Sequence, residues 1–156
     1  MINLLTYCCF AVSAGWSLQV FASGAPMSRA AMVSQSELIV IGKLSDRKDL
    51  DAMWATATLT IRETLKGDAN IRKLRMKFLA KPGNTSTWTY SGNEDGVWFL
   101  KKEGKGDKAT WSTFHPDGRM PLISNTDEGK KEIAQALQET KKLIAEEKKR
   151  GPLPKV

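Results

Sequence analysis

The sequence has little cysteine and almost no histidine. Its 156 residues include two cysteines, Cys8 and Cys9, and one histidine, His115. A zinc site needs three or four Cys, His or carboxylate ligands, so zinc is not expected. The acidic groups around Asp49 and Glu94 lack the spacing of an EF-hand loop, and no glycine-rich phosphate loop follows a predicted strand. We therefore expect no metal ion and no other cofactor.

Charged side chains are absent from the beginning of the chain, where Arg29 is the first. The apolar stretch "MINLLTYCCFAVSAGWSLQVFA" is typical of a secretory signal peptide, and Val20-Phe21-Ala22 predicts cleavage after Ala22. An uncleaved anchor is the alternative, but the polar residues within the stretch make a poor membrane span. The large Tyr7 before Cys8 argues against lipidation.

Both cysteines lie within this predicted signal peptide. The mature chain would therefore enter an exported compartment without any disulfide, which favours a bacterial secreted or periplasmic protein. Roughly 130 residues remain, enough for one domain. We expect a β domain over residues 23–124, a packed helix over 125–150 and a tail over 151–156, with no stable membrane span after cleavage.

Alternation of apolar and polar residues predicts the strands. It is clearest from Ala55 to Arg62 and from Lys73 to Phe78, while Leu38 to Leu44 is apolar on both faces, as in a buried strand. Gly42 within that buried strand predicts a bulge, and "SDRKDLD" after it reads as a polar loop. "RMPLIS", from Arg119, is expected to be extended.

A Lys-Gly-Asp tripeptide occurs twice, at Lys66–Asp68 and Lys105–Asp107. It could be an adhesion ligand, but both copies lie between predicted strands. Glycine supplies positive φ in such connections and aspartate bonds to its own backbone, so both copies are predicted to be turns. His115 begins "HPDG", which is also turn chemistry rather than a catalytic site.

Two helices are expected, a short one within Ser28–Glu37 and a long one beginning at Asn125. In the second, Asn125 as N-cap and Glu128 approximate a capping box. Its apolar positions recur at helical spacing along one face. They are Ile133, Leu137, Thr140 and Ile144.

Several segments together resemble small exported bacterial domains related to the netrin module and the tissue inhibitors of metalloproteinases. They are "SELIVIGKLSDRKD", "ATATLTIRETLKGD", "IRKLRMKF" and "GNEDGVWFLKKE", within Ser28 to Phe114. The resemblance implies a five-stranded, mostly antiparallel OB-like barrel, so the fold class is mainly β, or α+β overall. Those inhibitors chelate zinc through a free amino-terminal cysteine, which this mature chain lacks, so their mechanism is not implied.

Basic residues exceed acidic ones by seven, and the excess is concentrated between Ile71 and Lys108. Lys73, Arg75 and Lys77 would share one strand face, with aromatic residues in neighbouring segments. Basic and aromatic groups on one face are used to bind oligonucleotides and anionic glycans. The candidate binding residues are Lys73, Arg75, Lys77, Trp88 and Trp98. The alternative is that the basic residues are only solvated and the tryptophans are core.

No catalytic constellation is visible, so the sequence does not predict an enzyme. The favoured hypothesis is an exported, non-catalytic binding or scaffold module whose partner is a protein or an anionic envelope polymer. The alternative is an enzyme, or an accessory domain of an exported hydrolase, with a site assembled from scattered residues.

Overall fold

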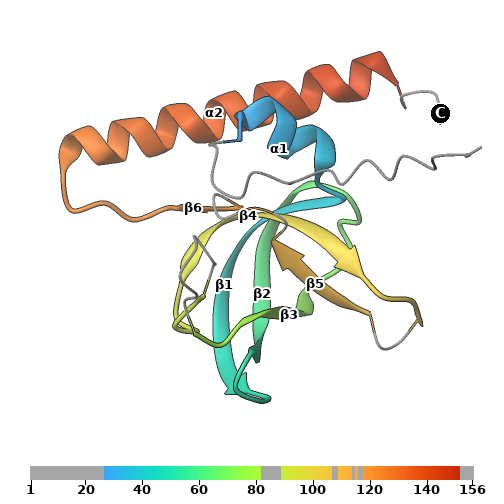
Figure 1. The fold of residues 1–156 in the computed structure, drawn as a ribbon. Coiled ribbons are helices and arrows are strands. Elements are labelled where there is room, and N and C mark those ends of the chain that lie inside the picture. Colours follow the sequence, from blue (N-terminus) through green and yellow to red (C-terminus); the bar gives the residue numbers. More distant parts are fainter. Residues whose placement is uncertain (1–26, 82–88, 107–108, 114, 116–117, 152–156) are drawn as a thin grey trace, which may run out of the picture.

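The computed structural model describes residues 27–81, 89–106, 109–113, 115 and 118–151. Over these residues the fold is mainly β with two helices, in agreement with the α+β class predicted (Figure 1). The predicted signal peptide, its cleavage site at Ala22, and Trp88 lie outside the described residues. The elements in chain order are α1 (Arg29–Gln35), β1 (Leu38–Asp49), β2 (Trp54–Lys66), β3 (Lys73–Leu79), β4 (Asp95–Glu103), β5 (Thr110–Thr113), β6 (Arg119–Pro121) and α2 (Asp127–Arg150).

Five of the strands pair in a ring. The sheet order is β1-β2-β3-β5-β4-β6, and β1 also pairs with β4. The predicted number of strands is corrected, because the described residues contain a sixth strand, β6, which pairs antiparallel with β4. Strand β3 pairs with β5 in parallel through Met76 and Trp111, while the other described ladders are antiparallel, as expected for a mostly antiparallel sheet.

Strand β1 is longer than its apolar run predicts. Residues read as a polar loop continue the ladder with β2, where Ser45 pairs with Thr58 and Lys48 with Thr56. The bulge predicted at Gly42 is confirmed by a register shift between Ile41 and Gly42. A Cβ added to Gly42 would lie 2.6 Å from the backbone oxygen of Thr60, so the close approach of β2 requires glycine.

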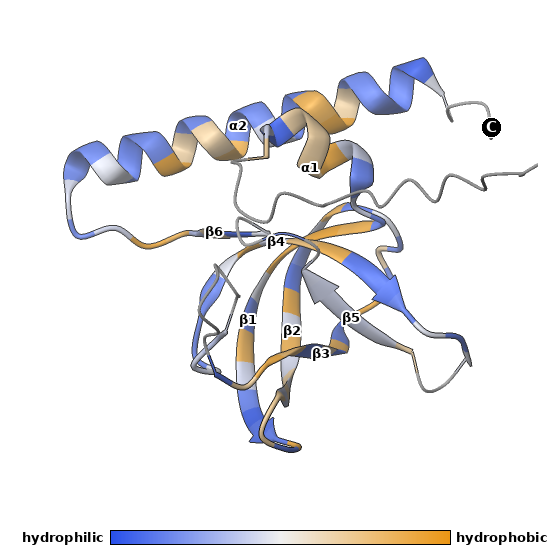
Figure 2. Cartoon of the chain, viewed as in Figure 1, coloured by the Kyte–Doolittle hydropathy of each residue, from blue (hydrophilic) through white to orange (hydrophobic). Residues whose placement is uncertain are grey.

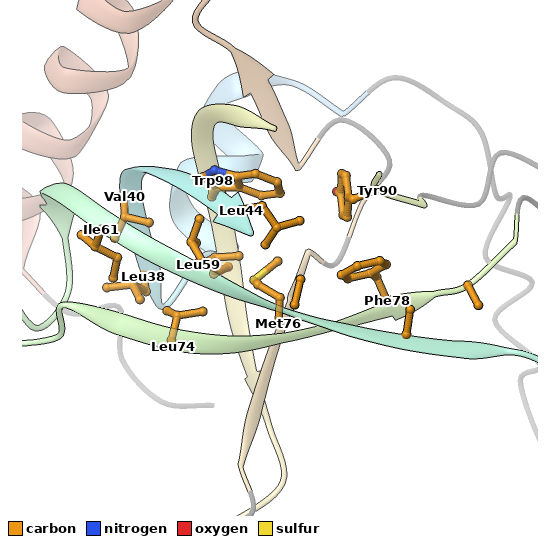
Figure 3. Close-up of a cluster of buried hydrophobic side chains, with 14 residues drawn as sticks. Leu38, Val40, Leu44, Leu59, Ile61, Leu74, Met76, Phe78, Tyr90 and Trp98 are labelled. Carbon is orange, nitrogen blue, oxygen red and sulfur yellow. The ribbon is translucent and has the colours of Figure 1, made fainter. Parts of the chain in front are cut away.

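The ring encloses one core (Figure 3). Alternate residues of each strand point into it, as the period of two requires. Phe78, Tyr90 and Trp98 pack edge to face, with ring centroids 5.2 Å and 5.1 Å apart. The buried members are Leu38, Val40, Leu44, Ala55, Ala57, Leu59, Ile61, Leu74, Met76, Phe78, Ala80, Tyr90, Trp98 and Leu100.

A second core lies between the strand ring and the helices, which Figure 1 shows together on one side of the strands. Its buried members are Met32, Val33, Ile39, Ile41, Val97, Phe99 and Ile144. Ion pairs also join α2 to the rest of the fold. Lys66 Nζ lies 2.8 Å from the Glu147 carboxylate and donates to the Val33 carbonyl, and Arg29 pairs with Glu139 at 3.2 Å.

Both predicted helices are present. Ser28 caps α1, since its hydroxyl accepts from the Ala31 N–H. The N-cap of α2 is Thr126 instead of Asn125, because the Thr126 hydroxyl accepts from the Gly129 N–H. The other cap is Gly151, whose φ is 72°. Within the described part of the chain, neither helix combines the length and apolar composition that a membrane span needs.

The first Lys-Gly-Asp copy is a turn, as predicted. Gly67 has a φ of 96°, and the Asp68 carboxylate accepts from the Asn70 N–H. In the second copy Gly106 also has positive φ, while Asp107 lies outside the described residues. The turn at "HPDG" is closed by a hydrogen bond from the Gly118 N–H to the His115 carbonyl, 2.9 Å long.

Candidate binding face on three strands

The predicted basic residues share the outward side of β3. Because Leu74, Met76 and Phe78 point into the ring, the residues between them point away from it. Lys73 and Arg75 are exposed, and Lys77 is half-buried. The structure therefore brings these three cations together on one face, although their role in binding stays a prediction.

The same face continues over β2 and β1. In the β2–β3 ladder, Thr60, Thr58 and Thr56 lie opposite Lys73, Arg75 and Lys77. In the β1–β2 ladder, the same threonines lie opposite Lys43, Ser45 and Lys48. A row of threonines is thus bordered by basic residues on both sides. We call these three rows the basic face.

Strand geometry sets the dimensions of this face. Neighbouring strands lie about 4.8 Å apart, so the two basic rows are separated by roughly 10 Å. Along β3, alternate residues are separated by about 6.7 Å. The cations therefore form two parallel rows. Between them lie the half-buried Thr58 and Thr60, whose hydroxyls can donate and accept hydrogen bonds, and the buried Thr56.

An aromatic residue of this face is Trp54, which was not among the predicted binding residues. It lies two residues before Thr56 in the same alternation, and the Lys77 ammonium lies 4.2 Å from the centre of its ring. Such a cation–π contact fixes both side chains at one end of the face. The period-two pattern that predicted β2 could have identified it, since Trp54 extends that pattern by one step.

Trp98 does not belong to the basic face, which corrects its selection as a stacking residue. Its side chain is fully buried in the core, and its indole N–H donates to the Gly42 carbonyl at 2.9 Å. Strand β4 is apolar on both sides here, so Trp98 points inward while Phe99 points toward the helices. The other selected tryptophan, Trp88, lies outside the described residues.

Nearby acidic side chains are already engaged. Asp95 receives two hydrogen bonds of 2.6 Å from Arg62, Asp49 pairs with Arg47 at 2.9 Å, and Asp46 accepts from the Ser45 hydroxyl. Bidentate arginine–carboxylate pairs are the stronger kind of charged hydrogen bond. The lysines of the basic face have no such carboxylate partner among the described residues, so the face remains positively charged.

Arg47 is basic but does not contribute to this face. Asp46, before it, has a positive φ of 56°, and the register of β1 shifts between Ser45 and Lys48. The Arg47 guanidinium donates to the carbonyls of Tyr90 and Ala80, each at 2.6 Å. Arg47 thus binds the loop before β4 to the end of β3, which is a structural role.

Two other polar groups are held by structural hydrogen bonds. The Tyr90 hydroxyl lies 3.0 Å from the Thr113 hydroxyl, and burial raises the pKa of Tyr90 to about 12. The Glu94 carboxylate accepts from the backbone N–H groups of Ser91, Gly92 and Asn93. Neither arrangement pairs a nucleophile with a base.

The part of the chain described here contains no candidate metal site. No group of three or more His, Cys, Asp or Glu residues within it could hold a metal ion.

No protein-family model matches the chain, and comparison with curated proteins gives no match. The functional assignment therefore depends on the surface chemistry of the basic face.

Proposed function

We propose that this chain is an exported, non-catalytic binding module whose basic face binds an anionic partner, either an envelope polymer or an acidic protein surface. The observation that supports this is the strand register, which aligns Lys73, Arg75 and Lys77 on one side of a threonine row and Lys43 and Lys48 on the other. A linear polyanion that lies along the strands could contact cations in both rows.

Charge and hydrogen bonding would act together on this face. A polyanion that binds there releases condensed counterions, which favours binding at low salt. The hydroxyls of the half-buried Thr58 and Thr60 would add hydrogen bonds that depend little on salt. Trp54 offers an aromatic surface at one end, although Lys77 already covers one side of its ring.

We propose further that the strand ring is an OB-like barrel over residues 23–124. Three features support it: the ring of five strands, the bulged β1 that pairs with both β2 and β4, and the closing parallel pair of β3 and β5. The helix over 125–150 would then be an addition packed on the barrel. An experimental structure that lacks pairing between β3 and β5 would contradict the barrel.

Export is the second component of this proposal. The apolar stretch before Arg29 and the small residue Ala22 support secretion or delivery to the periplasm, with cleavage after Ala22. Intact-mass measurement of the protein isolated after expression from its full sequence tests this directly. A mass that retains Cys8 and Cys9 would contradict cleavage.

Salt-dependent retention on heparin and on single-stranded nucleic acid tests the basic face. The variant Lys73→Ser/Arg75→Ser/Lys77→Ser removes one basic row. With three fewer contacts to a single-stranded polyanion, the log–log salt slope should become less steep by about 2. The matched control is Lys101→Ser/Lys102→Ser/Lys105→Ser, which removes the same charge from exposed residues at the end of β4 and just beyond it.

Equal loss in both triple variants would mean that net charge alone determines retention, and would contradict a defined face. Unchanged retention in the β3 variant would also contradict it and would leave these residues as a solvated surface. Circular dichroism of each variant checks that the fold is unaffected.

A further inference from the structure

The turn between β1 and β2 exposes apolar side chains at the end of a long hairpin. Leu50 is 58% exposed and Met53 is 62% exposed, although most large apolar residues of the described chain are buried. We call Leu50–Met53 the hairpin tip. Figure 1 shows that it extends beyond the strand ring on the side opposite the helices, and Figure 2 shows apolar colour at the tip beside the hydrophilic end of β1.

The hairpin tip is held in a fixed conformation. The Asp51 carboxylate accepts from the N–H groups of Met53 and Trp54, at 2.7 Å and 2.8 Å. The Leu50 N–H donates to the Trp54 carbonyl, and the Met53 carbonyl accepts from the Ala80 N–H, both at 2.8 Å. The backbone therefore presents Leu50 and Met53 outward without needing to reorganise on binding, which lowers the entropic cost of association.

Two exposed lysines border the tip. Lys48 is exposed two residues before Leu50, and Lys81 is exposed directly after Ala80, which bonds to Met53. Of the acidic residues here, Asp49 pairs with Arg47, while Asp51 keeps its negative charge but directs its carboxylate to the backbone of the turn. The half-buried Trp54 adjoins the tip, and Lys77 stacks on it. An apolar tip with a basic border is thus complementary to a surface that is negatively charged outside and apolar beneath.

We infer that the hairpin tip docks on an anionic lipid surface. Leu50 and Met53 enter the boundary between headgroups and acyl chains, while Lys48 and Lys81 contact the phosphates. Trp54 lies at the level where amphipathic aromatic rings are favoured. This inference goes beyond the proposed function, because the docking site is the end of the hairpin, which shares only Lys48 and Trp54 with the basic face.

The test measures co-sedimentation with vesicles of phosphatidylglycerol and phosphatidylcholine, and with vesicles of phosphatidylcholine alone. The protein is expressed from its full sequence and isolated from the soluble fraction, at identical chain length for every variant. We expect binding to the anionic vesicles, and an affinity at least tenfold lower in Leu50→Ser/Met53→Ser. The control Ile123→Ser removes an apolar side chain that is 72% exposed elsewhere, and it should bind like the parent.

Measuring vesicle binding at low and high salt separates the electrostatic contribution to affinity from the apolar one. Lys48→Ser/Lys81→Ser should reduce affinity about tenfold at low salt and much less at high salt, because screening already removes its contribution there. Lys101→Ser/Lys102→Ser is the charge-matched control. Leu50→Ser/Met53→Ser should lose affinity at both salt concentrations, while its retention on heparin stays that of the parent.

Three results would overturn the inference. The first is no binding of the parent to anionic vesicles. The second is equal binding of the parent and Leu50→Ser/Met53→Ser, which would leave the tip as a contact for a protein pocket. The third is vesicle binding that is lost only when Lys73, Arg75 and Lys77 are replaced, which would identify the lipid as another polyanion on the basic face and leave the proposed function intact.

Discussion

The strand ring has two walls that differ in what covers them. In the first, formed by Leu38–Gly42 of β1 and Gly96–Leu100 of β4, consecutive residues are buried, because one side faces the ring interior and the other faces the helices. In the second, formed by β3 and Ala57–Ile61 of β2, burial alternates, because only the inner side is fully packed. We call them the covered wall and the open wall. The basic face lies outside the covered wall, on the open wall and on the adjoining part of β1 from Lys43 to Lys48.

Because both sides of the covered wall are packed, we expect neighbouring residues of this wall to contribute strongly to stability. Trp98→Ala and Phe99→Ala should each reduce the free energy of unfolding by about 3–5 kcal/mol, because each leaves a cavity in one of the two cores. Urea denaturation measures both values. A loss below about 1 kcal/mol for Phe99→Ala would show that the helices do not pack on this wall.

The titration of Tyr90 reports whether water reaches the interior of the strand ring. Burial raises its pKa to about 12, above the usual value near 10, so the neutral phenol is the form that the fold favours. The folded chain then keeps a proton that the unfolded chain loses. This contribution is fully present below pH 10 and is lost as the pH rises through 12, by about 2–3 kcal/mol.

The measurement for Tyr90 is the free energy of unfolding as a function of pH from 9 to 12, in the parent and in Tyr90→Phe. Lysines also titrate in this range, but they contribute equally to both proteins, so the difference isolates Tyr90. Parallel pH profiles for the two proteins would mean that the hydroxyl is accessible to water in the folded chain.

Local patterns predicted the open wall well and the covered wall less well. Alternation from Ala55 to Arg62 and from Lys73 to Phe78 was sufficient for β2, β3 and the outward direction of the β3 cations, because a period of two determines both strand and face. The run from Val97 to Leu100 has no alternation, so it could not show which side Trp98 occupies. Its continuous apolar character did indicate that the strand is buried on both sides.

The second basic row was not predictable from local pattern. Lys43 and Lys48 face the threonines only because β1 pairs with β2 in a register that shifts between Ser45 and Lys48. A bulge moves the register by one residue, and such a shift reverses the face of every later side chain. The cap of α2 was displaced by one position for a simpler reason: Asn125 and Thr126 are both good N-cap residues, and the loop geometry selects between them.

The smallest predicted effect is the most specific to the open wall. Lys73→Ser and Arg75→Ser should each change the free energy of unfolding by no more than about 0.5 kcal/mol, because exposed side chains without tight partners contribute little. Lys77→Ser should cost slightly more, about 0.5–1 kcal/mol, since its ammonium contacts the Trp54 ring.

Met76→Ala, between Arg75 and Lys77 but pointing inward, should cost about 2–5 kcal/mol. Urea denaturation of the four variants therefore contrasts the two sides of one strand. If Arg75→Ser cost as much as Met76→Ala, the outer side of β3 would be packed against another part of the chain, and the basic face would not be available to a ligand.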